Sequence, residues 1–152
     1  MGINDNESPE IKIKFALWNC RSIRDNIKTA YLRNILLIQN IGIAVLNETF
    51  LSKGDKLFIR DFKIYRSDAQ IRRKGVAILI SKNLDVKVEK LESDELGRFL
   101  KISLTNQVSK ISRTIGTVYI EPTAIDTIDI PENIIYSDFL MGDLNGTNIR
   151  KI

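Results

Sequence analysis

The sequence predicts a domain of the α/β or α+β class, built from mixed, largely antiparallel sheet. Three observations support this fold class: many short apolar runs with strand-like patterns, one segment with clear helical spacing, and a length of 152 residues that suits one domain. Hydrophobic residues make up 43% and charged residues 28% of the chain, a composition typical of globular proteins.

The first predicted strand begins at Ile11 and ends at Asn19. Its apolar residues alternate with polar or small ones, the period-two pattern of a strand with one buried face. Residues 1–10 are polar, and we expect them to be flexible. The predicted domain therefore covers residues 11–152.

A helix is predicted after this strand. Asp25 or Asn26 can cap its start, and Gly42 is the expected terminator. Its buried face would consist of Leu32, Ile35 and Leu36.

Short apolar or alternating runs predict seven further strands. They lie at residues 43–46, 62–66, 75–80, 85–91, 99–104, 114–120 and 139–141. The range 122–137 is expected to be irregular, because Pro131 would break a helix there.

Composition excludes several classes of function. The sequence has no histidine, which removes Ser-His and Cys-His catalysis and histidine-based zinc sites. Cys20 is the single cysteine and cannot form an internal disulfide. The longest uncharged run, residues 34–47, is too short and too polar to cross a bilayer, and the start does not resemble a secretory signal. We expect no membrane partner and an intracellular location, nuclear or cytoplasmic.

Charge is distributed unevenly along the chain. Residues 52–113 contain 15 Lys or Arg against 8 Asp or Glu, whereas residues 114–149 contain 6 acidic residues and no basic one. The basic segment could attract a polyanion and the acidic segment could hold a hard cation, although solvated surface gives the same patterns.

Polar residues follow three of the predicted strands directly. They are Asn19, Glu48, and Asp143 with Asn145. Side chains at strand ends can converge without interrupting the core, so these positions are candidates for one site.

Read in order, these positions and their neighbours resemble the endonuclease/exonuclease/phosphatase superfamily, most closely the apurinic-type endonuclease domain of non-LTR retrotransposons. Five ordered segments carry the resemblance, which covers roughly residues 11–146. They are Trp18-Asn19-Cys20-Arg21-Ser22, Leu46-Asn47-Glu48-Thr49-Phe50-Leu51, the stretch from Tyr65-Arg66-Ser67-Asp68 to Gly75-Val76-Ala77-Ile78-Leu79, Val118-Tyr119-Ile120-Glu121-Pro122, and Gly142-Asp143-Leu144-Asn145-Gly146.

The resemblance implies a partial four-layer α/β/β/α sandwich in which the second sheet is incomplete. The family pattern continues beyond the last segment and ends in a Ser-Asp-His-type motif. Here the sequence ends six residues after Gly146 and offers no histidine. We therefore expect weak or absent activity, and sheet edges that a partner protein, a ribonucleoprotein or a second copy could cover.

The resemblance also implies a catalytic set of Asn19, Glu48, Tyr119, Asp143 and Asn145. Glu48 and Asn19 would bind Mg²⁺, a hard cation that prefers oxygen ligands. Tyr119 would donate to a phosphate oxygen, Asp143 would align or deprotonate the attacking water, and Asn145 would hold Asp143 and the phosphate.

Basic residues near these segments would contact the backbone of DNA or RNA, a sequence-independent and salt-sensitive contribution. The candidates are Arg21, Arg66, Arg72, Arg73 and Lys74.

Three functions remain open at this point. The first is a truncated or degenerate Mg²⁺-dependent phosphodiesterase of retroelement origin, associated with nucleic acid. The second is a non-catalytic interaction protein that docks on RNA or a large ribonucleoprotein assembly. The third is a phosphatase branch of the same superfamily, against which the retroelement-like residues 65–79 argue.

Overall fold

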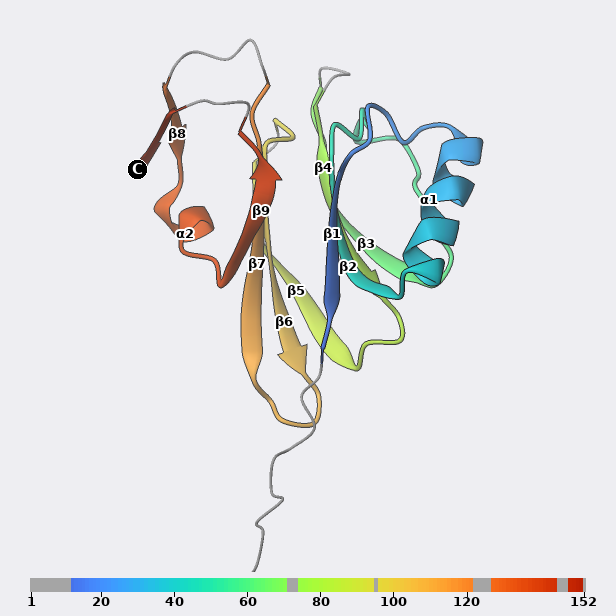
Figure 1. Ribbon diagram of the computed structural model, residues 1–152. Coiled ribbons are helices and arrows are strands. Elements are labelled where there is room, and N and C mark those ends of the chain that lie inside the picture. Colours follow the sequence, from blue (N-terminus) through green and yellow to red (C-terminus); the bar gives the residue numbers. More distant parts are fainter. Residues whose placement is uncertain (1–11, 71–73, 95, 122–126, 145–147, 152) are drawn as a thin grey trace, which may run out of the picture.

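The computed structural model describes residues 12–70, 74–94, 96–121, 127–144 and 148–151. It confirms the predicted mixed α/β class: two sheets of four strands each, with few helices (Figure 1). No helix in these ranges is long and apolar enough to span a membrane.

The first sheet has the strand order β1-β2-β4-β3. β1 pairs with β2 in parallel, and β4 is antiparallel to both of its neighbours. The strands are β1 (Lys14–Asn19), β2 (Ile41–Asn47), β3 (Phe62–Ser67) and β4 (Val76–Ser81). Their apolar patterns predicted each of them. The predicted start of the first strand, Ile11, lies outside the described residues.

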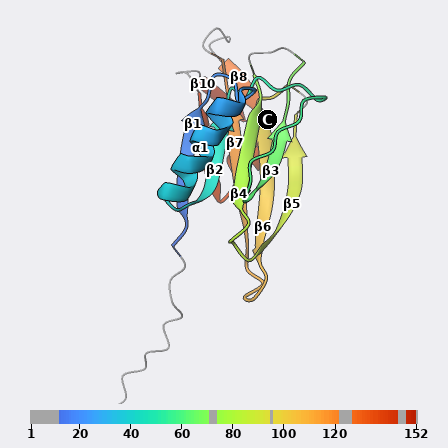
Figure 2. The ribbon, with the colours of Figure 1, turned by 90° about the vertical axis from the view of Figure 1, so that its right-hand side faces the viewer.

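Helix α1 (Asn26–Ile38) connects β1 to β2 and lies along the outer face of this sheet (Figure 2). Asp25 caps its start by accepting a hydrogen bond from the Ile27 N–H at 2.8 Å. The prediction that Gly42 terminates the helix is wrong. Asn40 takes the left-handed conformation after the last turn, with φ of 54°, and Gly42 lies inside β2.

The second sheet has the order β5-β6-β7-β9. Antiparallel pairing joins β5, β6 and β7, whereas β7 and β9 are parallel. The strands are β5 (Val86–Ser93), β6 (Phe99–Asn106), β7 (Ser112–Tyr119) and β9 (Phe139–Asp143).

The inner faces of the two sheets share one apolar cluster. The β2 and β4 strands contribute residues such as Val45 and Ile78, and the β6 and β7 strands contribute residues such as Ile102 and Ile115. Burial of these β-branched and leucine side chains holds the sheets face to face. The two sheets therefore carry their strand ends into a common region.

Residues 127–144 and 148–151 contain more regular structure than the sequence indicated. Helix α2 (Glu132–Ile135) follows Pro131, which stands at its N-cap and does not break it. Strands β8 (Thr127–Ile130) and β10 (Asn148–Lys151) form a separate parallel pair. Proline is tolerated there because the first N–H groups of a helix need no intrahelical partner.

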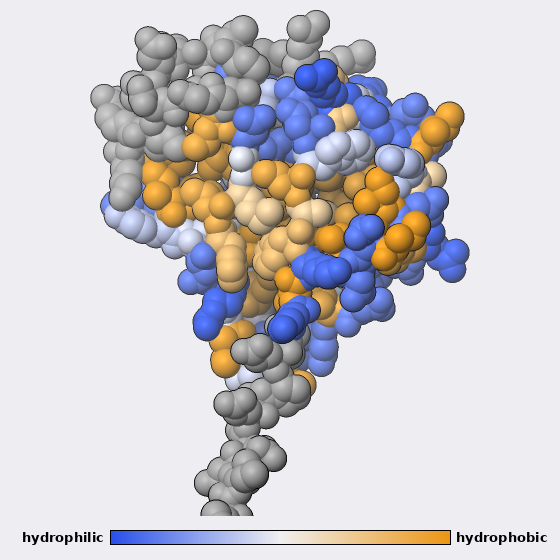
Figure 3. Space-filling view, viewed as in Figure 1, coloured by the Kyte–Doolittle hydropathy of each residue, from blue (hydrophilic) through white to orange (hydrophobic). Residues whose placement is uncertain are grey.

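The two sheets expose the edges of β1 and β9 on the same side of the molecule. The rings of Phe15 and Phe139 lie 5.4 Å apart across these edges. Leu17 and Phe139 are each 45% exposed, and Leu140 is 42% exposed. Apolar side chains gather on this side of the space-filling view (Figure 3).

Candidate active site

The loops that follow β1 and β2 form the first half of the site. The two strands end in register, with Asn19 opposite Asn47. Beyond the strands, the Ser22 N–H donates to the Glu48 carbonyl at 2.8 Å. Parallel pairing thus brings Asn19, which is exposed, and Glu48 to the same end of the sheet.

Glu48 has a backbone conformation that non-glycine residues adopt rarely, with φ of 55°. Hydrogen bonds to the two residues before β4 fix the loop directly after Glu48: the Thr49 N–H donates to the Gly75 carbonyl and the Phe50 N–H to the Lys74 carbonyl. Strained backbone of this kind persists where the surroundings hold it, and it clusters at functional sites.

Gly75 is required by this packing. Its φ is +111°, and a Cβ atom there would lie 2.2 Å from the Thr49 hydroxyl oxygen. Its N–H donates to the Gly97 carbonyl at 3.1 Å, which connects the Glu48 loop to the β5–β6 turn of the second sheet. Glycine therefore permits the close approach of three loops.

Lys28 and Cys20 stabilise the β1–α1 loop. The Lys28 ammonium donates to the successive carbonyls of Cys20, Arg21 and Ser22 at 2.7–3.1 Å. Burial raises the pKa of the Cys20 thiol to about 12, so the thiol stays protonated and donates to the carbonyls of Asn47 and Glu48 at 3.2 and 3.3 Å. Arg21 lies exposed on this loop, where the sequence placed a nucleic-acid contact.

Tyr119 and Asp143 form the other half of the site. They are in register at the ends of the parallel strands β7 and β9. The Tyr119 hydroxyl donates to Glu48 Oε1 at 2.5 Å, so this bond spans the two sheets. Beneath it, the buried Asn47 amide donates to the Thr117 hydroxyl at 3.3 Å.

The surroundings of Tyr119 raise its pKa well above the usual value of a phenol. Burial is the largest cause, followed by the hydrogen bond to Glu48 and the negative charges of Glu48, Glu121 and Asp143. The hydroxyl therefore remains a proton donor. Of these carboxylates, that of Glu48 contacts the hydroxyl directly.

Lys74 and Glu121 form an ion pair of 3.0 Å next to this cluster. Lys74 precedes β4 in the first sheet, and Glu121 follows β7 in the second. The sequence suggested Lys74 as a nucleic-acid contact but assigned no role to Glu121. The sequence cannot identify this pair from opposite charge alone, because the two residues meet only when the sheets dock.

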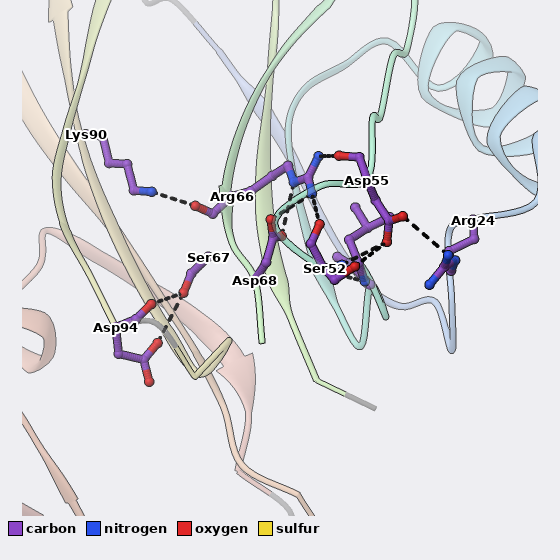
Figure 4. Close-up of polar contacts among 10 residues, drawn as sticks. Arg24, Ser52, Asp55, Arg66, Ser67, Asp68, Lys90 and Asp94 are labelled. Atoms are coloured by element: carbon purple, nitrogen blue, oxygen red, sulfur yellow. Dashed lines mark hydrogen bonds and ion pairs between the residues drawn. The ribbon is translucent and has the colours of Figure 1, made fainter. Parts of the chain in front are cut away.

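Arg66 is bound within the chain (Figure 4). Its guanidinium forms a bidentate pair with Asp68 at 2.7 and 3.0 Å, and it also donates to the carbonyls of Ser52 and Asp55. The guanidinium N–H groups of Arg66 therefore hold the β2–β3 loop in place. Three other predicted site residues lie outside the described residues: Arg72, Arg73 and Asn145.

The donor set at this end of the sheets fits Mg²⁺. Glu48 offers a carboxylate and Asn19 an amide oxygen, the hard ligand types that Mg²⁺ prefers. Among the described residues, no group of three His, Cys, Asp or Glu side chains is placed to hold an ion. Mg²⁺ binds through one or two carboxylates and keeps several waters, so a three-residue cage is not required.

Comparison with solved structures supports the fold. The chain is similar to the endonuclease domain of TRAS1, a telomere-specific non-LTR retrotransposon, with a TM-score of 0.55 and 17% identity over 74% of this chain and 47% of that one. It is also similar to the AP endonuclease LMAP from Leishmania major, with a TM-score of 0.54 and 17% identity over 70% and 39% of the two chains.

A third similar structure is an endonuclease/exonuclease/phosphatase family protein from Bacteroides thetaiotaomicron, with a TM-score of 0.53 and 12% identity over 74% and 51% of the two chains. No protein-family model matches the sequence. The chain spans about half the length of these structures or less. Its fold is similar to that of these three structures, which include an endonuclease/exonuclease/phosphatase family protein, and this agrees with the resemblance found in the sequence.

Proposed function

We propose that this chain is part of a Mg²⁺-dependent phosphodiesterase domain that acts on nucleic acid and derives from a retroelement endonuclease. The observation that carries the proposal is the hydrogen bond from Tyr119 to Glu48. It brings together, from two sheets and across 71 residues of sequence, two of the positions that the motifs single out. Two of the similar structures are endonucleases, which supports a nucleic-acid substrate.

In the proposed mechanism, Glu48 and Asn19 would hold a Mg²⁺ ion, which would neutralise charge that develops on the phosphate. Tyr119 orients Glu48, because the phenol has one O–H group and uses it to donate a hydrogen bond to the Glu48 carboxylate. Asp143, in register with Tyr119, aligns or deprotonates the attacking water. Asn145 would hold Asp143 and the phosphate in place.

We further propose that these 152 residues alone hydrolyse slowly. They include no histidine, and so cannot supply an imidazole donor for the phosphate oxygens. Loss of one preorganised transition-state donor costs on the order of 100- to 1,000-fold in rate. A domain with this function works where nucleic acid is present, in the nucleus or the cytoplasm.

A supercoiled-plasmid nicking assay tests the proposal. Nicking should require Mg²⁺, stop with EDTA, and disappear in Glu48→Gln and Asp143→Asn. Glu89→Gln is the matched control, because Glu89 lies exposed on β5 away from the site. Circular dichroism of each variant confirms that it is folded. Absence of nicking by the folded chain at high enzyme concentration would contradict the proposal.

A second candidate is a non-catalytic interaction protein that docks on RNA or a large ribonucleoprotein assembly. The exposed apolar edges of β1 and β9 favour it, because a protein surface of such an assembly could cover them. Leu17 and Phe139 lie on these edges, where unpaired strands invite contact with another surface. Copurification of the folded, inactive chain with a defined ribonucleoprotein would favour this function over hydrolysis.

A further inference from the structure

The Lys74–Glu121 ion pair crosses from one sheet to the other at the candidate active site. The Lys74 ammonium lies 3.0 Å from Glu121 Oε1, and the two side chains are only 20% and 29% exposed. Lys74 lies just before β4 and Glu121 just after β7, so the pair forms where the two sheets dock. Partial burial makes the pair stronger than a fully solvated one.

The position of the pair relates it to the site. The Lys74 carbonyl accepts from Phe50, two residues after Glu48. Glu121 lies two residues after Tyr119, and its charge acts on the Tyr119 hydroxyl. A phosphate bound near Glu48 and Tyr119 would therefore approach the Lys74 ammonium.

A carboxylate and a phosphate oxygen are alternative partners for an ammonium group. Each accepts its hydrogen bonds and carries negative charge. Glu121 Oε2 is buried, and it has no hydrogen-bond partner within the described part of the chain. The carboxylate is thus held through one oxygen by Lys74, and not by a network that would fix it independently.

We propose that Glu121 competes with the nucleic-acid backbone for Lys74, and so sets how strongly the site binds phosphate. This inference rests on the proposed nucleic-acid function. In the free protein Glu121 forms an ion pair with Lys74. When nucleic acid binds, a backbone phosphate replaces Glu121 as the partner of the Lys74 ammonium, and the Glu121 carboxylate turns toward solvent.

A binding experiment without metal separates this role from catalysis. Fluorescence anisotropy with a labelled DNA duplex, and in parallel a labelled RNA, is measured in EDTA over a range of salt concentrations. The variants are Glu121→Gln, Lys74→Gln and the double substitution. Glu89→Gln changes the net charge equally at an exposed position and serves as the control. Thermal melting confirms the fold of each variant.

Release of Lys74 in Glu121→Gln should tighten binding by about fivefold, the scale of one partly exposed ion pair. The slope of log K against log salt on duplex DNA should change little in Glu121→Gln, because Lys74 contacts a phosphate in both complexes. It should become shallower by about 0.9 in Lys74→Gln, which loses that contact. Lys74→Gln should weaken binding. In the Lys74→Gln background, Glu121→Gln should have no more effect than Glu89→Gln has in the wild type.

Two results would overturn the inference while leaving the proposed function intact. One is an affinity of Glu121→Gln for DNA and RNA that equals the affinity of the wild type. The other is tightening of equal size with and without Lys74, which would indicate general charge repulsion. Failure of every folded variant to bind DNA or RNA would overturn both the inference and the nucleic-acid function.

Discussion

The hydroxyl of Tyr119 and the carboxylate of Glu48 are joined by a hydrogen bond of 2.5 Å that spans the two sheets. Glu48 stands in a left-handed backbone conformation after β2, and Tyr119 ends β7. A rare conformation and a cross-sheet bond at the same residue indicate that the Glu48 side chain is held in one orientation.

Loss of the Tyr119 hydroxyl should reduce nicking activity. In Tyr119→Phe the Glu48 carboxylate loses its donor, and we expect a decrease of about 100-fold at a fixed Mg²⁺ concentration. Because Tyr119 positions a metal ligand, the variant should also need more Mg²⁺ for half-maximal rate. Tyr31→Phe, exposed on α1, is the control. An unchanged Mg²⁺ requirement would contradict this positioning role.

The raised pKa of Tyr119 predicts its behaviour at alkaline pH. Its folded pKa lies above the unfolded value of about 10, so the stability gained from the protonated phenol is fully present below pH ~10 and is lost as pH rises further. In an alkaline titration followed by tyrosinate absorbance, the Tyr119 phenol should ionise after the exposed tyrosines, and only when the protein unfolds. This late component should be missing in Tyr119→Phe. Its persistence there would assign it to Tyr65, whose pKa burial also raises.

Replacement of Gly75 by alanine should destabilise the Glu48 loop. A side chain at φ of +111° is strained, and its Cβ would collide with the Thr49 hydroxyl. We expect a loss of about 1–3 kcal/mol in the free energy of unfolding, measured by urea denaturation. Gly54→Ala is the matched control, because its Cβ would meet open space. Equal stability of the two variants would refute the packing argument.

The exposed edges of β1 and β9 predict self-association of the isolated chain at high concentration. Analytical ultracentrifugation should detect species larger than the monomer, and the pair Leu17→Lys and Leu140→Lys should suppress them. Val108→Lys, exposed in the β6–β7 hairpin, should not. Association that the edge substitutions leave unchanged would locate the contact elsewhere.

Much of the strand pattern could be predicted because burial on one face leaves a period of two in the sequence. Local turn chemistry was less predictable: Asn40, not Gly42, takes the left-handed conformation after α1. The ends of the strands singled out Asn19, Glu48, and Asp143 with Asn145 as candidates for one site, whereas Tyr119 came from the family resemblance alone. The Lys74–Glu121 pair and the internal role of Arg66 could not be predicted, because they depend on how loops and sheets dock.

The cross-sheet bond between Glu48 and Tyr119 has a consequence for the order of folding. Neither sheet alone contains the complete site. Glu48 and Tyr119 are separated by 71 residues and meet only after the two sheets dock. Contacts of such long sequence separation form late and slowly. Catalytic competence would therefore be among the last properties the nascent chain acquires, and a folding intermediate with only the first sheet would carry Glu48 without its donor.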